Sequence, residues 1–243
     1  MRLWYDKPAE EWNHALPVGS GKLGAMVFGG VSSERIQMNE DSIWAGPPVP
    51  EAQAGAKEII EQARTLLFDG QYAQAQTMVQ EHVMGERISP RSYQPLGDFR
   101  IDLEGVQEYE AYTRELTLKT AIATTQWTTN GTTFQREVFA SAVDHAIVCR
   151  LKSGQEKLLS CRISFDRKEN AQWMTISDDT LLITGCAGHG DLHSGVGFAA
   201  VIKVIVEDGE IQNEDPDFVV KNANAVTLLV CVQTDYNFEN PSE

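Results

Sequence analysis

The chain has 243 residues, of which 42% are hydrophobic and 23% are charged, and its formal net charge is −15. This composition lies near the globular average, so it excludes wholesale disorder and predicts a packed core. The negative charge argues against nucleic acid as a partner, because an acidic surface repels phosphate backbones. No stretch approaches the roughly 20 apolar residues that span a bilayer, so no membrane segment is expected.

The N-terminus and the cysteines both indicate a reducing compartment. No apolar run of a secretory signal follows Met1, so the expected location is the cytoplasm. Cys149, Cys161, Cys186 and Cys231 are widely spaced and form no C-x-x-C pair, so no zinc or redox motif is expected. Cys149 and Cys231 lie in the apolar runs AIVCRL and LLVCVQ and are expected to be buried free thiols, with a disulfide pair as the alternative.

The first motif along the chain is G-x-G-x-x-G, formed by Gly19, Gly21 and Gly24. A dinucleotide-binding fingerprint needs a strand before these glycines and a helix after them. Pro17 removes a strand hydrogen-bond donor before the motif, and the residues after it, AMVFGG, have the pattern of a strand. Leu23 stands where a P-loop requires Ser or Thr. The glycines are therefore interpreted as positions for tight turns and close backbone approach.

A hairpin of strands and then a hairpin of helices are predicted next. Strands at 25–28 and 34–38 are joined by a glycine-containing loop. In 51–83, apolar residues recur at three- and four-residue spacing, which gives each of two helices one apolar face. Gly70 stands where a left-handed cap would end the first helix. The helical insertion is therefore placed at about 51–84.

From Gly97 onward the pattern is that of β structure. Residues 114–119 alternate polar and apolar side chains, as a half-buried strand does. Asn130 and Gly131 lie between two strand-like runs, and this pair is the strongest short hairpin signal because both turn residues need positive φ. Further strands are expected at 146–151, 158–165, 180–184, 196–206, 218–220 and 226–233. Together they predict a mainly β fold: one large antiparallel β-sandwich over 1–243 with an inserted helical hairpin.

Two segments supply most of the candidate site residues. Asn39, Glu40 and Trp44 lie around a turn, where an exposed tryptophan beside Gly and Pro could stack on a sugar face. Tyr93 and Gln94 share the same two interpretations, which are proximity to a substrate cleft and packing at an interface.

A catalytic role is not expected for the acidic residues of the first segment. Glu40 and Asp41 would point to opposite sides of an extended segment. Glu40 is expected to pair with Arg35, while Asp41 is expected to cap a turn. Inversion at a sugar centre needs two carboxyl groups roughly 6.5–9.5 Å apart, and the sequence context marks no such pair.

The histidines are weaker candidates. His189, Asp191 and His193 form H-x-D-x-H, which on a strand would place three metal ligands on one face. The surrounding glycines favour a loop instead, so His189 and Asp191 are grouped with the cleft or interface candidates and no metal is expected. His14 and His145 are isolated in the sequence and are expected to be packing residues.

Six ordered blocks of the sequence resemble glycoside hydrolase family 95. The segment LPVGSGKLGAMVFGG followed by ERIQMNEDSIWAG resembles the start of that family. The similarity continues in LFDGQYAQAQ, YQPLGD, YTREL, REVFAS and VTLLV, which stand at 67–76, 93–98, 112–116, 136–141 and 226–230. Blocks spread over nearly the whole chain are far more specific than any single motif.

The resemblance implies an α-L-fucosidase, with some members acting on related α-L-galactosides. Members look like an N-terminal β-sandwich, a helical linker, an (α/α)6 barrel and a C-terminal β domain, and they hydrolyse α-1,2-linked fucose with inversion. A carboxylic acid protonates the leaving oxygen, while water activated with the help of asparagine and carboxylate side chains attacks the opposite face. These groups lie in the barrel, which this chain is expected to lack, so no catalytic residue and no cofactor is assigned.

The expected function is thus that of a non-catalytic N-terminal domain. It would pack on a catalytic barrel, of the same or a separate chain, and shape one rim of the cleft, and the chain alone is expected to be inactive. Two alternatives stay open. One is an independent module that binds fucosylated oligosaccharides, and the other is an interaction domain for another protein.

Overall fold

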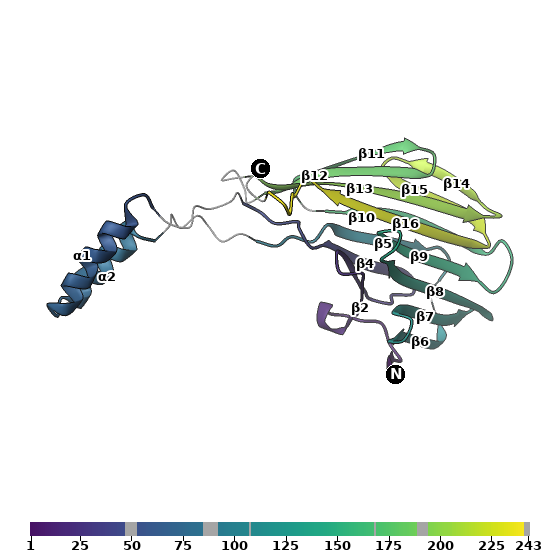
Figure 1. Ribbon diagram of the computed structural model, residues 1–243. Coiled ribbons are helices and arrows are strands. Elements are labelled where there is room, and N and C mark those ends of the chain that lie inside the picture. Colours follow the sequence, from purple (N-terminus) through teal and green to yellow (C-terminus); the bar gives the residue numbers. More distant parts are fainter. Residues whose placement is uncertain (47–52, 85–91, 107, 168, 189–193, 241–243) are drawn as a thin grey trace.

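In the computed structural model of the protein, two antiparallel β-sheets pack face to face and make up most of the structure (Figure 1). It describes residues 1–46, 53–84, 92–106, 108–167, 169–188 and 194–240. Sixteen strands of these residues form the two sheets, and a short 3₁₀ helix, η1 (Trp12–His14), precedes the second strand. The predicted mainly β sandwich with a helical hairpin is confirmed.

The nine-stranded sheet combines strands from both ends and the middle of the chain. In spatial order its strands are β1 (Arg2–Tyr5), β6 (Glu110–Thr117), β7 (Ile122–Thr129), β8 (Thr132–Ser141), β9 (Ala146–Ser153), β16 (Ala225–Thr234), β13 (Ser194–Glu207), β12 (Thr180–Gly188) and β11 (Ala171–Ser177). Asn130 and Gly131 join β7 to β8 with φ of 49° and 73°, so the predicted tight hairpin is confirmed.

The seven-stranded sheet carries the glycine motif at its edge. In spatial order its strands are β14 (Glu210–Glu214), β15 (Asp217–Ala223), β10 (Leu159–Asp166), β5 (Gly97–Leu103), β4 (Ser33–Glu40), β3 (Leu23–Val27) and β2 (Leu16–Gly19). Gly19 pairs with Gly24, and the chain turns between them, so the glycines build a hairpin. The expectation that Pro17 prevents a strand is wrong, because β2 is an edge strand and one of its sides needs no donor.

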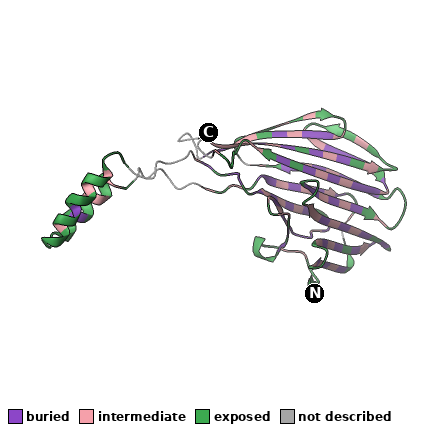
Figure 2. Cartoon of the chain, viewed as in Figure 1, coloured by how far each residue is buried: buried purple, intermediate pink, exposed green. Residues whose placement is uncertain are grey.

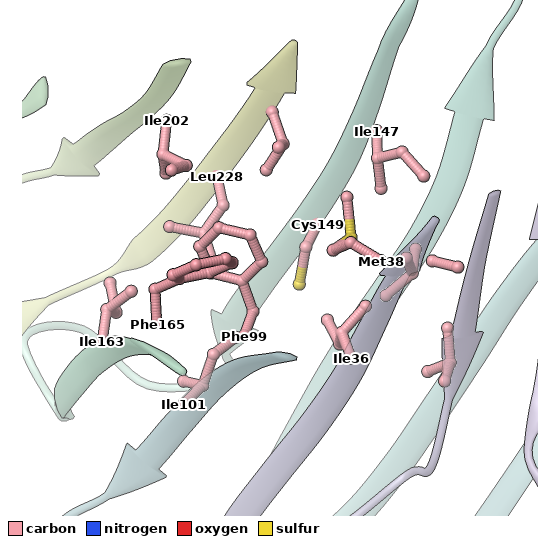
Figure 3. Packing of buried hydrophobic residues seen from close by; sticks show 14 of the residues in the cluster. Ile36, Met38, Phe99, Ile101, Ile147, Cys149, Ile163, Phe165, Ile202 and Leu228 are labelled. Carbon is pink, nitrogen blue, oxygen red and sulfur yellow. The ribbon is translucent and has the colours of Figure 1, made fainter. Parts of the chain in front are cut away.

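The core fills the space between the sheets. Side chains alternate along each strand, so β4 turns every second residue inward. Figure 3 shows the two sheets meeting through apolar side chains from three strands of each: Ile36, Met38, Phe99, Ile101, Ile163 and Phe165 on one side, and Ile147, Cys149, Ile202 and Leu228 on the other. Continuous packing of this kind holds the sheets at a fixed spacing and fixes the positions of the loops at their ends.

One ion pair crosses this core. Glu34 of β4 and Arg136 of β8 are fully buried and hydrogen-bonded to each other, so they join the two sheets. Glu34 Oε1 also accepts the backbone N–H groups of Phe28 and Gly29, both at 3.0 Å. The Arg136 guanidinium lies 5.4 Å from the centre of the Trp127 ring. Burial raises the pKa of Glu34, and the charge of Arg136 opposes that shift.

The helical hairpin stands away from the sandwich (Figure 1). It consists of α1 (Ala56–Phe68) and α2 (Tyr72–His82), which pack on each other. Gly70 has φ of 76° and donates to the carbonyl of Leu67, while Gln71 donates to the carbonyl of Leu66, so the predicted left-handed cap is confirmed. Neither of the two described helices is long and apolar enough to cross a membrane.

Three side chains are more exposed than the sequence predicts. All four cysteines are free, and Cys149 is buried, but Cys231 is exposed. It lies on a central strand between the inward residues Val230 and Val232, so it points to the outer face of the sheet. His14 and His145 are exposed as well, and the expectation that they pack inside is wrong. They lie at the end of η1 and in the β8–β9 turn, which are surface connections.

Candidate functional site

Five of the seven candidate residues lie together at one end of the sandwich, and we call Asn39, Glu40, Trp44, Tyr93 and Gln94 the end cluster. Two strand-like segments bring them together across the helical insertion. Trp44 and Tyr93 form an isolated antiparallel bridge. The N–H of Gln94 donates to the carbonyl of Ile43 at 3.0 Å, and Ala45 donates to Ser92 at 2.9 Å. These bonds fix the segment before β5 against the turn that follows β4.

Trp44 and Tyr93 form an exposed aromatic pair with a defined geometry. Their ring centres are 5.4 Å apart and their planes meet at 62°, an edge-to-face arrangement. Trp44 is 44% exposed and Tyr93 is 39% exposed. The Trp44 indole N–H donates to the carbonyl of Asp41 at 2.9 Å, and the Tyr93 hydroxyl lies 3.1 Å from both Asn39 Oδ1 and the Glu40 carbonyl. Both rings are therefore held in place while part of each faces outward.

The surroundings of Tyr93 keep its hydroxyl protonated. Partial burial, together with the negative charges of Glu40 and Asp41, raises the pKa of Tyr93 to about 12. The hydroxyl is therefore neutral at physiological pH and acts as a hydrogen-bond donor toward Asn39 or the Glu40 carbonyl.

Glu40 is an internal support for the turn. Its side chain is fully buried, and its Oε2 accepts the N–H of Ser42 at 2.8 Å and the Ser42 hydroxyl at 2.7 Å. The Ser42 hydroxyl also lies 2.6 Å from that of Thr234 on β16, which links the turn to the other sheet. Glu40 Oε1 lies 3.7 Å from Lys22 Nζ and has no hydrogen-bond partner among the described residues.

The predicted pairing of Glu40 with Arg35 is wrong. Arg35 Nε donates instead to Asp98 Oδ2 at 2.8 Å. The two residues are five apart on β4, so they point to opposite faces of the sheet: Glu40 faces the core, and Arg35 faces outward. Asp41 follows the end of the strand and is exposed, in agreement with the prediction that neighbouring Glu40 and Asp41 point apart.

Gln94 is held by a half-buried arginine, Arg167, that the sequence did not indicate. Gln94 Nε2 donates to the carbonyl of Gly188 at 2.7 Å, and its Oε1 accepts from Arg167 Nη2 at 3.0 Å. Arg167 also donates to the carbonyl of Leu96 at 3.0 Å and lies 4.5 Å from the centre of the Phe198 ring. Burial lowers the pKa of Arg167. Arg167 thus ties the segment that carries Tyr93 to the nine-stranded sheet.

The turn that carries Trp44 is wedged against the start of β13. The N–H of Val196 donates to the Trp44 carbonyl at 3.0 Å. A Cβ at Gly195 would overlap the carbonyl oxygens of Trp44 and Ala187, so only glycine allows this close approach. The end cluster is therefore supported by both sheets.

The histidine motif lies outside the described residues, and so do the candidates His189 and Asp191. The chain enters this segment from Gly188, whose carbonyl accepts from Gln94, and leaves it at the start of β13 beside Trp44. Among the residues that the structure describes, no group of three or more His, Cys, Asp or Glu side chains could hold a metal ion.

The chemistry of the end cluster is suited to binding. It offers two partly exposed aromatic rings, the half-buried amide of Asn39 and the exposed carboxylate of Asp41. Aromatic faces contact apolar ring surfaces, and amides and carboxylates accept or donate hydrogen bonds to hydroxyl groups. Glu40, the acidic member of the cluster, is fully buried, so Glu40 and the neighbouring Asp41 do not present an opposed pair of carboxyl groups for hydrolysis.

The fold and this end of it define a β-sandwich domain with a rigid, partly exposed aromatic pair. Residues 3–239 match the family described as glycosyl hydrolase family 65, N-terminal domain, and the chain belongs to this family of domains. The expectation of a glycoside hydrolase N-terminal domain is therefore confirmed at that level.

Two curated relatives are similar to this chain in sequence, and one solved structure is similar to it in fold. "Alpha-L-fucosidase 2" of Arabidopsis thaliana is 28% identical over 99% of this chain and 31% of its own length. "Probable alpha-fucosidase A" of Aspergillus niger is 31% identical over 62% of this chain and 20% of its own length. The structure "Putative kojibiose phosphorylase from human microbiome" has the same fold, with a TM-score of 0.50 and 13% identity over 100% of this chain and 33% of that one. The chain spans about a third or less of the length of these proteins.

Proposed function

We propose that the chain is the non-catalytic N-terminal domain of a family 95 α-L-fucosidase, an enzyme that hydrolyses α-1,2-linked L-fucose with inversion. Its role is to pack on the catalytic barrel and to shape one wall of the cleft. The fucosidase names of two relatives support the substrate class, and one of these relatives aligns with 99% of the chain. The barrel supplies the acid and the base, and this domain supplies contacts that orient the sugar.

The single observation that carries the proposal is the Trp44–Tyr93 pair. A flexible surface tryptophan would lose entropy on binding, but the Trp44 indole is already fixed by its bond to the Asp41 carbonyl and by its contact with Tyr93. In this proposal the Trp44 ring lies against the apolar face of a sugar, while the side chains of Asn39 and Asp41 form hydrogen bonds with the hydroxyl groups of that sugar. Gln94 and Glu40 stabilise the segments that carry the two rings, through their hydrogen bonds with Gly188 and Ser42.

Enzyme kinetics test the role of this domain in shaping the cleft. They are measured on the polypeptide encoded by the complete reading frame. With 2'-fucosyllactose as substrate, Trp44→Ala is expected to raise KM roughly 3- to 10-fold, because an aromatic contact is worth about 0.5–1.5 kcal/mol. A small change in kcat is expected, since the contact exists before and during the reaction.

The matched control is Trp12→Ala. Trp12 is 51% exposed, and its indole N–H donates to Gln37 Oε1 at 2.7 Å, so it resembles Trp44 in exposure and in hydrogen bonding. It lies in η1, outside the end cluster. Equal KM values for Trp44→Ala and Trp12→Ala would contradict the wall at Trp44. The 243-residue chain alone should release no fucose.

The exposure of the same pair favours one second candidate, an independent carbohydrate-binding module. Calorimetric titration of the 243-residue chain with fucosylated oligosaccharides separates the two. Heat of binding at millimolar sugar that disappears in Trp44→Ala would support the module, and no heat in the wild-type chain would exclude it.

A further inference from the structure

Helix α1 carries an apolar stripe that α2 leaves uncovered. Ile60, Leu67 and Phe68 lie on one side of α1, since positions seven and eight residues after Ile60 return to its face of the helix. They are 38%, 47% and 91% exposed, and we call them the hairpin stripe. Tyr72, which begins α2 beyond the turn, is 68% exposed. Figure 2 shows both helices exposed over most of their surface.

The interior of the hairpin is too small to stabilise it. Within the two described helices only Ala63 and Ala75 are buried. The helices have 13 and 11 residues, a length at which isolated helices are marginal in water. Most helical stability in proteins comes from burying an apolar face, and the larger apolar side chains of these helices, such as Leu66 and Val79, are at most half-buried. The hairpin therefore has more apolar surface to bury than α1 and α2 bury in each other.

The ends of the hairpin are nevertheless well formed. At the tip, Gly70 closes α1 with the two hydrogen bonds described above. At the base, Gln53 Nε2 donates to the carbonyl of Met84 at 3.0 Å and to that of Glu81 at 3.3 Å. The helical hairpin thus has well-defined ends and an exposed apolar surface, which is the arrangement expected of a segment that binds another protein surface.

The hairpin projects from the end of the sandwich that carries the end cluster. Its insertion lies between Gly46 and Ser92, and Ser92 accepts a hydrogen bond from Ala45, next to Trp44. Strand β16 ends in the same region, since the hydroxyl of its last residue, Thr234, lies 2.6 Å from that of Ser42 (Figure 1). A body that covers this end of the sandwich would therefore meet the end cluster and the hairpin together.

We propose that the hairpin stripe docks in an apolar groove of the catalytic domain of the same polypeptide, an inference that rests on the proposed function. The curated relatives leave room for such a body, because this chain aligns with only 31% and 33% of two of them along nearly its whole length. A groove between helices suits this partner, since ridges of side chains on a helix pack into such grooves. Lys57 and Arg64 lie on the same face of α1 between Ile60 and Phe68, and Glu61 lies beside Phe68, so the groove must also contact charged side chains.

Hydrogen exchange of two proteins tests the proposal: the 243-residue chain, and the polypeptide encoded by the complete reading frame that contains it. Backbone amides of α1 are expected to exchange at least ~10-fold more slowly in the longer polypeptide, because docking suppresses local opening. Phe68→Asp should restore fast exchange in α1. Phe68→Ala should do the same while it keeps a strong helix former at that position.

Val143→Asp is the matched control. Val143 is 89% exposed in the turn between β8 and β9, so it has nearly the same exposure as Phe68 but lies outside the hairpin. This variant should retain slow exchange in α1. Equal exchange of α1 in the two proteins would overturn the proposal, and so would a reading frame that stops after Glu243. Protection in the 243-residue chain that grows with its concentration would also overturn it, since a second copy would then cover the stripe.

Fucose release by the same longer polypeptide separates this inference from the proposed function. Release of fucose without protection of α1 contradicts the docking of the hairpin and leaves the proposed function standing. Protection of α1 without release of fucose supports the docking and contradicts the proposed fucosidase activity.

Discussion

Charged side chains at two places, one buried and one half-buried, link segments that are far apart in the sequence. Glu34 and Arg136 join the two sheets inside the core, and Arg167 joins the segment before β5 to the nine-stranded sheet. Glu34 and Arg167 each make several hydrogen bonds, which offset the cost of removing their charges from water. Nε and Nη1 of Arg136 are buried without a hydrogen-bond partner among the described residues, so its charge is balanced chiefly by Glu34.

Arg136→Met is expected to destabilise the chain by about 3–5 kcal/mol, because it leaves the carboxylate of Glu34 buried without its partner. The double variant Glu34→Leu with Arg136→Met should lose less, since it contains no unpaired buried charge. Urea unfolding of the three proteins measures the difference. A double variant that is less stable than the single one would contradict this account of the pair.

Tyr93 gives a pH dependence of known sign. Its pKa is raised to about 12, whereas an unfolded tyrosine titrates near 10. The unfolded chain therefore loses its proton first, and the stability contributed by Tyr93 is present below pH ~10 and is lost as the pH rises toward ~12. Unfolding midpoints of wild type and Tyr93→Phe should converge over this range. A difference between the two that stays constant with pH would contradict the shift.

Single-residue environments were the least predictable part of the chain. Arg167 follows a strand in the run FDRKEN, which has the pattern of a surface turn, and no sequence signal marks it as the residue that holds Gln94. Glu40 was predicted to pair with Arg35 on its own strand, but its carboxylate accepts from Ser42. The Ser42 hydroxyl in turn lies 2.6 Å from that of Thr234, which is 192 positions further along the chain. Such contacts are set by the packing of two sheets, which local sequence patterns do not contain.

Elements were predicted much better than their environments. The Asn130–Gly131 hairpin, the Gly70 cap and every strand named in the sequence agree with the structure, because these features depend on local backbone preference and alternation. The strands β1, β2, β5, β11 and β14 were not predicted, and all of them except β5 lie at the edge of a sheet. An edge strand pairs on one side only, so β2 tolerates Pro17.

The turn after β4 depends on a glycine at position 195 of β13. Gly195→Ala would push a Cβ against the carbonyl groups of Trp44 and Ala187, so the turn must move or β13 must shift. The expected cost is about 1–3 kcal/mol, as for other overpacked positions. The fluorescence of Trp44 should also change in Gly195→Ala. The contribution of Trp44 is obtained by subtracting the spectrum of Trp44→Phe from that of the wild type. Gly24→Ala is the control, because its Cβ would meet only the Val18 carbonyl at 3.5 Å.

At the scale of the whole molecule the chain consists of two parts with very different interiors. The sandwich has a continuous core that both sheets share, whereas the described helices bury two alanines. Hydrogen bonds between β4 and β5 close the sheet across the insertion, so the sandwich does not need the hairpin for its own continuity. The hairpin should therefore open without unfolding the sandwich.

Two alanine-to-glycine variants measure whether the parts are independent. Ala63→Gly in α1 should weaken the helical signal by circular dichroism, since glycine costs about 1 kcal/mol in a helix, and should leave the tryptophan-detected melting midpoint unchanged. Ala200→Gly in β13, which is fully buried in the sandwich core, should lower that midpoint by roughly 2–4 °C. A midpoint lowered equally by Ala63→Gly would mean that the hairpin and the sandwich unfold together, and the hairpin would then already have its partner within this chain.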